Sequence, residues 1–171
     1  ADNFTGVVIY SPEQRCYLHE EAAQALALAQ AELSARRPGF RLIAYDCARP
    51  QRAQKRLFDA VKNTPRGRYV ANPNRGEPSR HCRGLAIDLS ILDEKGLPLD
   101  MGTAYDFLGP LAEPRLEAQF LAAKQLTQAQ LANRRLLREV MKKAGFGGLP
   151  TEWWHFNFRP KKAVDSYPLI P

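Results

Sequence analysis

Two segments that are far apart in this chain carry the residues that most constrain its fold. The first contains His81 and Asp88, and the second contains His155 with Glu152 three residues before it. Two neutral imidazoles and one carboxylate suit a zinc ion, and three protein ligands leave one coordination position open for water. An open position is typical of a catalytic metal site rather than a structural one. We therefore expect a fold that brings the two segments together.

The length and composition are those of one globular domain. A chain of 171 residues can bury its own core, and we expect residues 1–171 to form a single domain. Hydrophobic residues make up 44% of the chain and charged residues 25%, which is ordinary. No apolar run approaches the roughly 20 residues of a membrane-spanning helix, and no signal segment opens the chain. Because the chain begins with Ala1, we expect that an N-terminal piece has been removed.

The net charge of +7 raises the question of an anionic partner. The basic residues are dispersed, with no run longer than a pair. They are also not interleaved with aromatic residues, as they are in proteins that bind single-stranded nucleic acids. We therefore expect solvated basic faces and no nucleic-acid partner, while non-specific attraction to anionic cell-wall polymers stays open.

The three cysteines are Cys16, Cys47 and Cys82, and no two of them form a CxxC pair. This spacing argues against a disulfide framework and against a cysteine-rich zinc site. One bridge, such as Cys16 to Cys47, would be allowed in an exported protein, but we expect buried free thiols. Cys82 is next to His81, and adjacent side chains rarely point at one ion, so we expect a packing thiol there.

The apolar pattern predicts an α+β fold. The predicted elements are a strand over 6–10, a helix over 19–37, a strand over 40–45, a helix over Gln51–Val61, a strand over 85–91 and a strand over 153–158. A turn over 93–96 is expected to lead into a partner strand. Thr127 and Gln130 form a capping box for a further helix, which Gly145 ends.

The neighbourhood of the first metal motif can be interpreted in more detail. Residues 63–80 are interrupted by proline and glycine, and we expect a long loop with a short regular piece near Tyr69. Loops of this length often cover or bind a ligand. The strand over 85–91 alternates, which predicts a half-buried strand whose small and polar face carries Asp88. A turn at Gly84 would let His81 and Asp88 converge.

The candidate residues also have structural interpretations. A single buried histidine is more often structural, but His81 and His155 together with Asp88 and Glu152 favour a metal site. We expect Glu152 in the turn before the last strand, from where it reaches the metal. The third histidine, His19, is expected to cap the first helix or to face solvent. The chain has no HExxH motif, which excludes the zincin arrangement.

Three further residues are open to two interpretations. Arg49 precedes a helix and could equally pair with Asp46 at the surface. Asp106 could be a turn residue, and Ser79 could cap a loop.

Several motifs together resemble one family. Ser79-x-His81-x-x-Gly84-x-Ala86-x-Asp88 and Glu152-x-x-His155 are similar to the SxHxxGxAxD and ExxH signatures of the zinc D,D-peptidases. One branch, the D-alanyl-D-alanine dipeptidases of the vancomycin-resistance type, resembles the chain more closely. The further matches are Tyr45-Asp46-x-x-Arg49-Pro50, Met101-Gly102 with Asp106, and Glu152-Trp153-Trp154-His155-Phe156. The resemblance runs from Asn3 nearly to the C-terminus.

The resemblance implies a fold and a mechanism. The fold would be a central, mainly antiparallel sheet flanked by helices, as in the hedgehog and D,D-peptidase proteins. The residues His81, Asp88 and His155 would bind one zinc ion per chain. Glu152 would be the catalytic base, Arg49 would face the reacting carbonyl, Ser79 would contact the substrate and Asp106 would hold its ammonium group. The substrate would be the small dipeptide D-Ala-D-Ala, hydrolysed to two D-alanines.

Alternatives remain at this point. One is a D,D-carboxypeptidase or another peptidoglycan peptidase on the same scaffold, and a more remote one is a zinc-binding interaction domain without catalysis. Ala48, Arg80 and Cys82 depart from the family pattern, which leaves the shape of the pocket open. We expect a bacterial protein and favour the periplasm over the cytoplasm. The sequence does not decide the oligomeric state or a role in resistance rather than D-alanine salvage.

Overall fold

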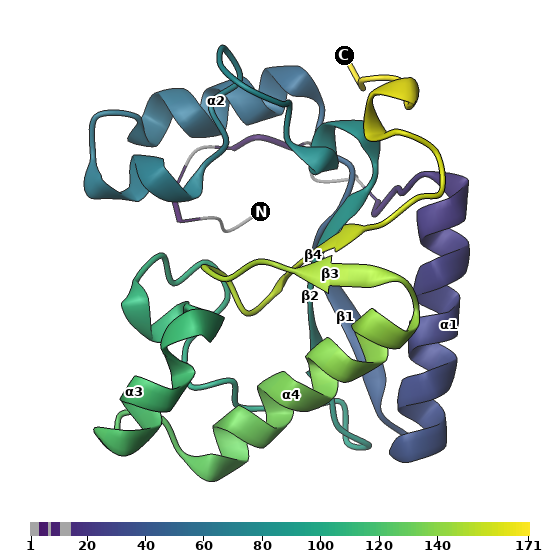
Figure 1. Ribbon diagram of the computed structural model, residues 1–171, viewed down its shortest axis with the longest axis vertical. Coiled ribbons are helices and arrows are strands. Elements are labelled where there is room, and N and C mark those ends of the chain that lie inside the picture. Colours follow the sequence, from purple (N-terminus) through teal and green to yellow (C-terminus); the bar gives the residue numbers. More distant parts are fainter. Residues whose placement is uncertain (1–3, 7, 11–14) are drawn as a thin grey trace.

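The computed structural model describes residues 4–6, 8–10 and 15–171 of the chain (Figure 1). The helices of the described chain are α1 (Glu20–Arg36), α2 (Gln51–Val61), α3 (Glu117–Ala122) and α4 (Gln128–Lys143). The strands are β1 (Arg41–Asp46), β2 (Ala86–Leu92), β3 (Phe146–Gly148) and β4 (His155–Phe158). Short 3-10 helices lie at Pro65–Tyr69, Arg80–Arg83, Pro110–Ala112, Pro114–Leu116 and Val164–Ser166.

The strands form one antiparallel sheet in the order β1-β2-β4-β3. The α+β class with a mainly antiparallel sheet is therefore confirmed. Figure 1 shows α1 and α4 close to the sheet, while α2 and α3 lie farther out, at opposite ends of the view. Within the described chain, no helix combines the length and the apolar character that crossing a membrane requires.

One face of the sheet packs against α1 and α4 and forms the core. Ile87, Leu89 and Ile91 of β2 are fully buried there, together with Phe156 of β4. The buried residues of α1 are mostly alanines, spaced three and four apart, and Leu33 follows at the same spacing. Small side chains on that stripe let the helix approach the sheet closely. The other face of the sheet is thereby left to carry the polar residues.

Most of the predicted elements are present. The helix predicted over 19–37 is α1, α2 has the predicted bounds, and the strand predicted over 40–45 is β1. The capping box of Thr127 and Gln130 is formed in both directions at the start of α4. The regular piece expected near Tyr69 is the 3-10 helix Pro65–Tyr69.

Four predictions need correction. The strand predicted over 6–10 includes Val7, which lies outside the described residues, and the rest of that stretch forms no strand. β2 is buried on both faces rather than half-buried; on the second face, Tyr105 of an irregular segment lines the cavities beside Asp88 and Ser90. The partner strand after the turn at 93–96 is reduced to one bridge between Leu92 and Pro98, since proline has no N–H to donate to a ladder. The last strand begins at His155, not at 153.

Two elements were not predicted at all. β3 contains two glycines, and α3 has only six residues. Neither has enough apolar periodicity to be recognised in a single sequence.

The expectation of free thiols is wrong for two of the three cysteines. Cys16 and Cys47 form a disulfide with an S–S distance of 2.04 Å. Cys82 is free and buried, as expected for a packing thiol. Sequence spacing does not reveal this disulfide, because the pairing of the two cysteines depends on how the segment before α1 runs beside the end of β1.

We predict that Leu33→Ala destabilises the protein by about 2–5 kcal/mol, because the substitution leaves a cavity between α1 and the sheet. The matched control is Leu28→Ala in the same helix, where the leucine is 66% exposed. The control should change the free energy of unfolding by less than about 0.5 kcal/mol. Urea unfolding monitored by circular dichroism measures both values, and equal losses would contradict the packing described here.

Candidate active site

The pairing of β2 with β4 places two of the predicted ligands side by side. Asp88 and His155 are direct partners in the antiparallel register, so their side chains lie on the same face of the sheet. Their neighbours Ile87 and Phe156 are also partners and face the core. The alternation of β2 therefore separates a polar face from an apolar one, as predicted, although both are buried.

His81 reaches this face from a single turn of 3-10 helix, Arg80–Arg83. The turn ends at Gly84, which has the left-handed φ of 65°. A Cβ at Gly84 would lie 2.7 Å from the backbone nitrogen of His19, so only glycine fits this position without a shift. The chain reverses there and runs back along β2 to Asp88, which is the convergence that we expected from the sequence.

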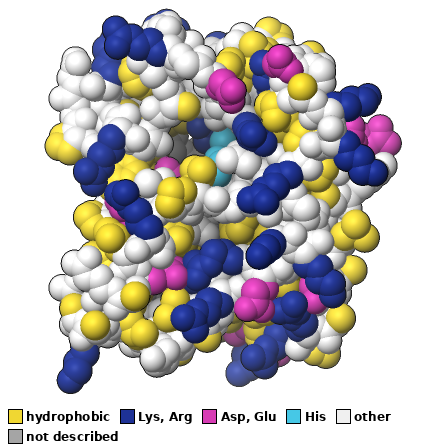
Figure 2. Space-filling model, viewed as in Figure 1, with side chains coloured by type: hydrophobic (Ala, Val, Ile, Leu, Met, Phe, Trp, Pro, Cys, Tyr) yellow, Lys and Arg dark blue, Asp and Glu magenta, His cyan; other side chains and the backbone are white. Residues whose placement is uncertain are grey.

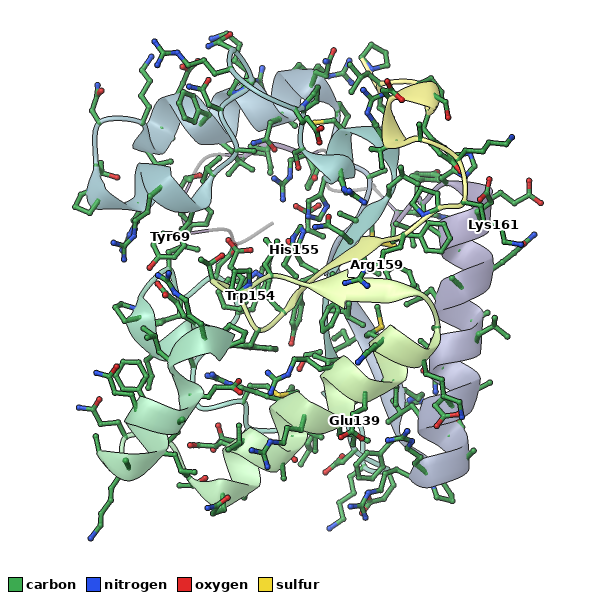
Figure 3. The ribbon with its side chains drawn as sticks, viewed as in Figure 1. Tyr69, Glu139, Trp154, His155, Arg159 and Lys161 are labelled. Carbon is green, nitrogen blue, oxygen red and sulfur yellow. A yellow bond between two sulfur atoms is a disulfide. The ribbon has the colours of Figure 1, made fainter. Side chains whose placement is uncertain are left out.

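The three candidate ligands converge on one point. His155 Nδ1 lies 2.9 Å from Asp88 Oδ1 and 3.2 Å from His81 Nε2. The distance between His81 Nε2 and Asp88 Oδ1 is 3.5 Å. All three side chains are buried. Figure 3 shows His155 near the centre of the molecule, with Trp154 beside it.

In both imidazoles, the ring nitrogen that points away from the other candidate ligands forms a hydrogen bond. His81 Nδ1 lies 2.6 Å from the carbonyl oxygen of Cys47, and His155 Nε2 lies 3.0 Å from Asn157 Oδ1. Both oxygens can only accept, so both of these nitrogens carry the hydrogen. In neutral imidazoles, the lone pairs of His81 Nε2 and His155 Nδ1 are then directed toward each other and toward the carboxylate of Asp88.

Such a set of electron pairs fits a cation. Bonds of about 2.0–2.1 Å at tetrahedral angles would separate two ligand atoms by roughly 3.3 Å. The three separations in this site, from 2.9 to 3.5 Å, bracket that value. Without a cation, three acceptors would face one another in a buried place, which is electrostatically unfavourable. These three residues could therefore hold a divalent metal ion.

Glu152 lies in the irregular stretch directly before β4, where we expected it. One carboxylate oxygen is 4.0 Å from His155 Nδ1, and the residue is 9% exposed. Burial raises the pKa of Glu152 to about 7, the charge of Asp88 adds to this effect, and His155 opposes it. A carboxylate with a pKa near neutrality can both accept and return a proton.

Arg49 forms the ion pair with Asp46 that the sequence left open, but this pair is buried rather than at the surface. Its Nε donates to Asp46 Oδ2 at 2.9 Å, and its Nη2 lies 3.8 Å from Asp88 Oδ2. A register shift between Ala44 and Asp46 brings Asp46 opposite Asp88. The bulge turns the end of β1 toward the site, and Arg49 follows three residues later.

All seven candidate residues line one cavity with a volume of about 90 Å³. Ser79 lies at its wall, and Asp106 enters it from a backbone with the left-handed φ of 60°. Burial raises the pKa of Asp106 to about 7 and the nearby Asp88 adds to this, while the backbone N–H of Phe4 opposes it. Figure 2 shows a hollow near the middle of the molecule in which histidine atoms are visible.

The loop over 63–80 contributes a wall of this cavity through Tyr69, Val70 and Ala71. Tyr69 OH donates to Glu113 Oε1 at 2.8 Å, which connects this loop to the segment ahead of α3. Glu113 is 1% exposed, and its other oxygen accepts from Arg115. The long loop is thus pinned across the cavity, in keeping with the covering loop that its length suggested.

Two residues that sequence analysis missed support the site. Gln54 accepts from Arg49 Nη1 at 2.8 Å and donates to the carbonyl of Ala71. Gln54 is a buried polar residue on the apolar face of α2. A polar residue at an apolar position of a predicted helix could have indicated a role in the site. Asn157 follows His155 by two positions, so strand alternation alone places it on the same face. The side chain of His19, by contrast, lies outside the cavity: its Nδ1 accepts from the Glu21 N–H at the start of α1, and its ring contacts Tyr167.

This arrangement has the chemistry of a metal-dependent hydrolase, and comparison with known proteins gives the family. Residues 1–169 match the model of peptidase family M15, described as D-ala-D-ala dipeptidase, and the chain belongs to this family. A D-alanyl-D-alanine dipeptidase of Escherichia coli strain K12 is 41% identical over 99% of this chain and 79% of its own length. Proteins of the same name from Enterococcus faecalis and Enterococcus faecium are 30% and 32% identical, over 97% of this chain and 85% of their own lengths.

We predict that His155→Ala weakens the binding of a divalent metal by more than about 100-fold, beyond the range of changes in outer-shell partners. Titration with Co²⁺, followed by its visible absorption, measures the affinity. The matched control is His19→Ala, which removes an imidazole outside the cavity but keeps the backbone N–H that donates to Gly84, and it should leave the affinity unchanged. Equal affinities of wild type and His155→Ala would remove this residue from the metal site.

Proposed function

We propose that this protein is a zinc-dependent dipeptidase that hydrolyses D-Ala-D-Ala to two molecules of D-alanine. The observation that carries the proposal is the convergence of His81, Asp88 and His155 beside Glu152 in one small buried cavity. Membership of a family described as D-ala-D-ala dipeptidase, with bacterial relatives that bear that name, supports the same substrate.

The ligand set supports zinc among the divalent metals. Imidazole nitrogens and a carboxylate oxygen suit Zn²⁺, and three protein ligands are usual in its catalytic sites. We propose that His81, Asp88 and His155 hold one ion per chain. When bound, such an ion would lower the pKa of a water molecule and polarise the carbonyl of the peptide.

Glu152 is the proposed catalytic base. Its carboxylate is next to the metal ligands, and its pKa near 7 makes it a base at neutral pH. It would take a proton from the attacking water and deliver it to the nitrogen of the leaving D-alanine. A domain that only bound zinc and a partner would have no use for a buried glutamate at this point.

Arg49 is proposed to stabilise the negative charge that develops on the carbonyl oxygen. A guanidinium has five N–H donors, and three hydrogen bonds to Asp46 and Gln54 hold the group in place. In the proposal, an N–H group that these bonds do not use donates to the carbonyl oxygen of the substrate. Loss of one such donor typically costs about 3–4 kcal/mol of transition-state stabilisation.

Asp106 and Ser79 are proposed to bind the rest of the dipeptide. The ammonium group of a dipeptide is only a few atoms from the scissile bond, and a carboxylate in the same cavity can pair with it. A cavity of about 90 Å³ is small beside the roughly 300–1,000 Å³ of sites for drug-sized ligands. This size favours a free dipeptide over the longer peptides that a D,D-carboxypeptidase would accept.

The location and extent of the enzyme are part of the proposal. The Cys16–Cys47 disulfide supports a periplasmic protein, because disulfides persist in oxidising compartments and are rare in the cytoplasm. We also propose that residues 1–171 act as one domain.

The central experiment is the release of D-alanine from D-Ala-D-Ala by the zinc-loaded protein. We expect turnover that a chelator abolishes and added zinc restores. Glu152→Gln keeps the size of the side chain but removes the base, and it should lower kcat by a factor of about 10²–10⁴ with zinc still bound. Metal analysis and circular dichroism of the variant are the controls. An absence of chelator-sensitive D-alanine release would refute the assignment, and an unchanged rate in the variant would refute the role of Glu152.

The same assay separates the dipeptidase from its alternative. An N-acylated tripeptide that ends in D-Ala-D-Ala has no free ammonium group for Asp106. Preference for that blocked substrate would identify a D,D-carboxypeptidase instead.

We predict that the KM for D-Ala-D-Ala rises as the pH falls below about 7, by up to about tenfold per pH unit. The raised pKa of Asp106 means that its carboxyl group is neutral below that pH and no longer attracts an ammonium group. Asp106→Asn, which tolerates the same left-handed backbone, should have a high KM without this dependence. A wild-type KM that is constant from pH 5 to pH 8 would contradict the role of Asp106.

The sign of the effect on stability gives an independent check of the same residue. A carboxyl group whose pKa is higher in the folded than in the unfolded state stabilises the fold at low pH, and this contribution is lost as the pH rises from about 4 to 7. Metal-free Asp106→Asn should therefore gain stability relative to wild type over that range.

A further inference from the structure

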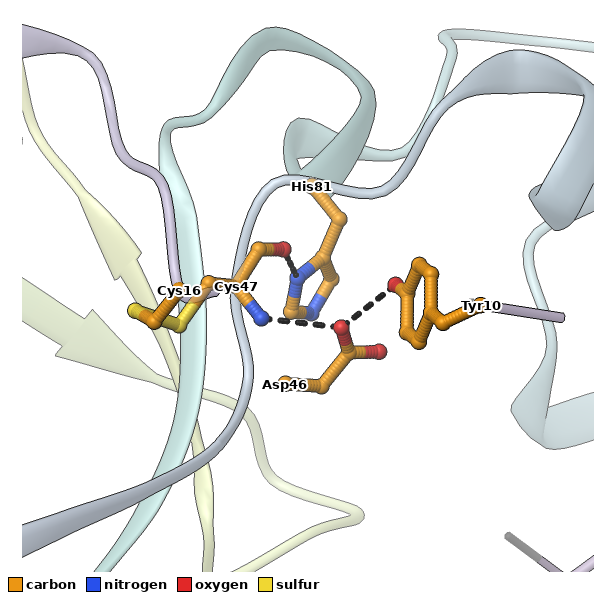
Figure 4. Close-up of a disulfide and its surroundings, with 5 residues drawn as sticks. All are labelled: Tyr10, Cys16, Asp46, Cys47 and His81. Carbon is orange, nitrogen blue, oxygen red and sulfur yellow. Dashed lines mark hydrogen bonds between the residues drawn. A yellow bond between two sulfur atoms is a disulfide. The ribbon is translucent and has the colours of Figure 1, made fainter. Parts of the chain in front are cut away.

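The Cys16–Cys47 disulfide lies directly behind the candidate metal site and has no part in the proposed reaction. Figure 4 shows Cys47 between the disulfide and the ring of His81. The carbonyl oxygen of Cys47 accepts from His81 Nδ1 at 2.6 Å, and its N–H donates to Asp46 Oδ1 at 2.8 Å. One residue thus contacts a proposed metal ligand and the carboxylate that holds Arg49.

The segment that contains Cys16 connects two parts of the site. The carbonyl of Tyr17 accepts from the N–H of Ala48 at 2.8 Å, next to Cys47. Two residues later, the N–H of His19 donates to the carbonyl of Gly84 at 2.9 Å, at the turn that follows His81. Residues 15–19 therefore act as a strut between the end of β1 and the His81 turn.

Beyond the disulfide and these two hydrogen bonds, the strut is held within the described chain only at its C-terminal end, where Leu18 packs against the core and the ring of His19 contacts Tyr167. Residues 15–19 belong to no helix or strand, and Cys16 and Tyr17 are exposed. Exposed backbone outside regular structure opens at low free-energy cost. Cys47 is 6% exposed and well packed, so the disulfide anchors the exposed segment to the buried one. The covalent bond closes a loop with a sequence separation of 31 residues.

We propose that the Cys16–Cys47 disulfide is a positioning element of the metal site. By fixing the carbonyl of Cys47, it holds the ring of His81 with Nε2 aimed at Asp88 and His155. This inference rests on the proposed function, since it assumes that His81 binds a metal. Loss of an outer-shell partner of a ligating histidine typically lowers metal affinity or activity by a factor of about 10–100. The protein would then need an oxidising environment for full metal loading.

The test compares zinc affinity with and without the disulfide. The variant Cys16→Ser with Cys47→Ser removes the bond and leaves the Cys47 carbonyl in the backbone. Competition with a chromophoric chelator gives the dissociation constant of Zn²⁺, and the visible spectrum of bound Co²⁺ reports the ligand geometry. We expect an affinity lower by about tenfold and an altered Co²⁺ spectrum.

Reduction of the wild type is the second arm. A phosphine breaks the S–S bond and is oxidised to its oxide with the oxygen of one water molecule, whose two hydrogens leave both sulfurs as thiols. After removal of the phosphine without air, the wild type should lose the same affinity as the double variant. The double variant treated in the same way should not change. Cys82 stays a thiol throughout, because burial raises its pKa and keeps it unreactive.

A further control separates positioning from general stability. Leu33→Ala weakens the core on the other side of the sheet and should leave the zinc affinity of the folded protein unchanged. Equal affinity losses in this variant and the double cysteine variant would overturn the inference. Unchanged zinc affinity without the disulfide would also overturn it, as would three titratable thiols when the purified protein is denatured without a reductant. Zinc affinity is independent of D-alanine release, so a failure of the dipeptidase assay alone would refute the proposed function and not this inference.

Discussion

The antiparallel register between β2 and β4 is the constraint on which the site depends. It pairs Asp88 with His155 on one face and Ile87 with Phe156 on the other. A shift of one residue would move every side chain of a strand to the opposite face, and both ligands would then enter the apolar core. Burial of the apolar face against α1 and α4 makes that shift costly, so the core of the protein also determines the geometry of the metal site.

Several charged side chains are buried on the second face of the sheet, and the cost of burying each of them is offset in a different way. Arg49 is held between Asp46 and Asp88, so a cation and its carboxylates compensate one another. Within the described chain, Glu152 and Asp106 form no ion pair with an arginine or a lysine, and burial raises the pKa of both to about 7. Buried groups with pKa values shifted in this way occur often at functional sites. The site therefore needs contacts from surrounding segments to hold its residues in place. The loop over 63–80 and the Cys16–Cys47 disulfide provide such contacts.

Much of the fold and of the candidate site could be predicted from local patterns. The helices over α1 and α2, the capping box at Thr127 and the alternation of β2 follow from spacing within a few residues. The seven candidate residues came from motif spacing and from a family resemblance, and the structure brings all of them to one cavity. The partner strand that was expected after the turn at 93–96 failed because Pro98 limits the ladder to a single bridge.

The sequence by itself determined which residues can bind a metal and which strand faces are apolar, since these properties depend on side-chain chemistry and short-range periodicity. Only the tertiary structure decided that Arg49 pairs with Asp46 in a buried place, that Cys47 rather than solvent orients His81, and that Cys16 reaches Cys47. Each of these depends on how segments distant in the chain approach each other. How these segments approach one another depends on packing, on strand register and on the bulge in β1. No pattern among neighbouring residues encodes it.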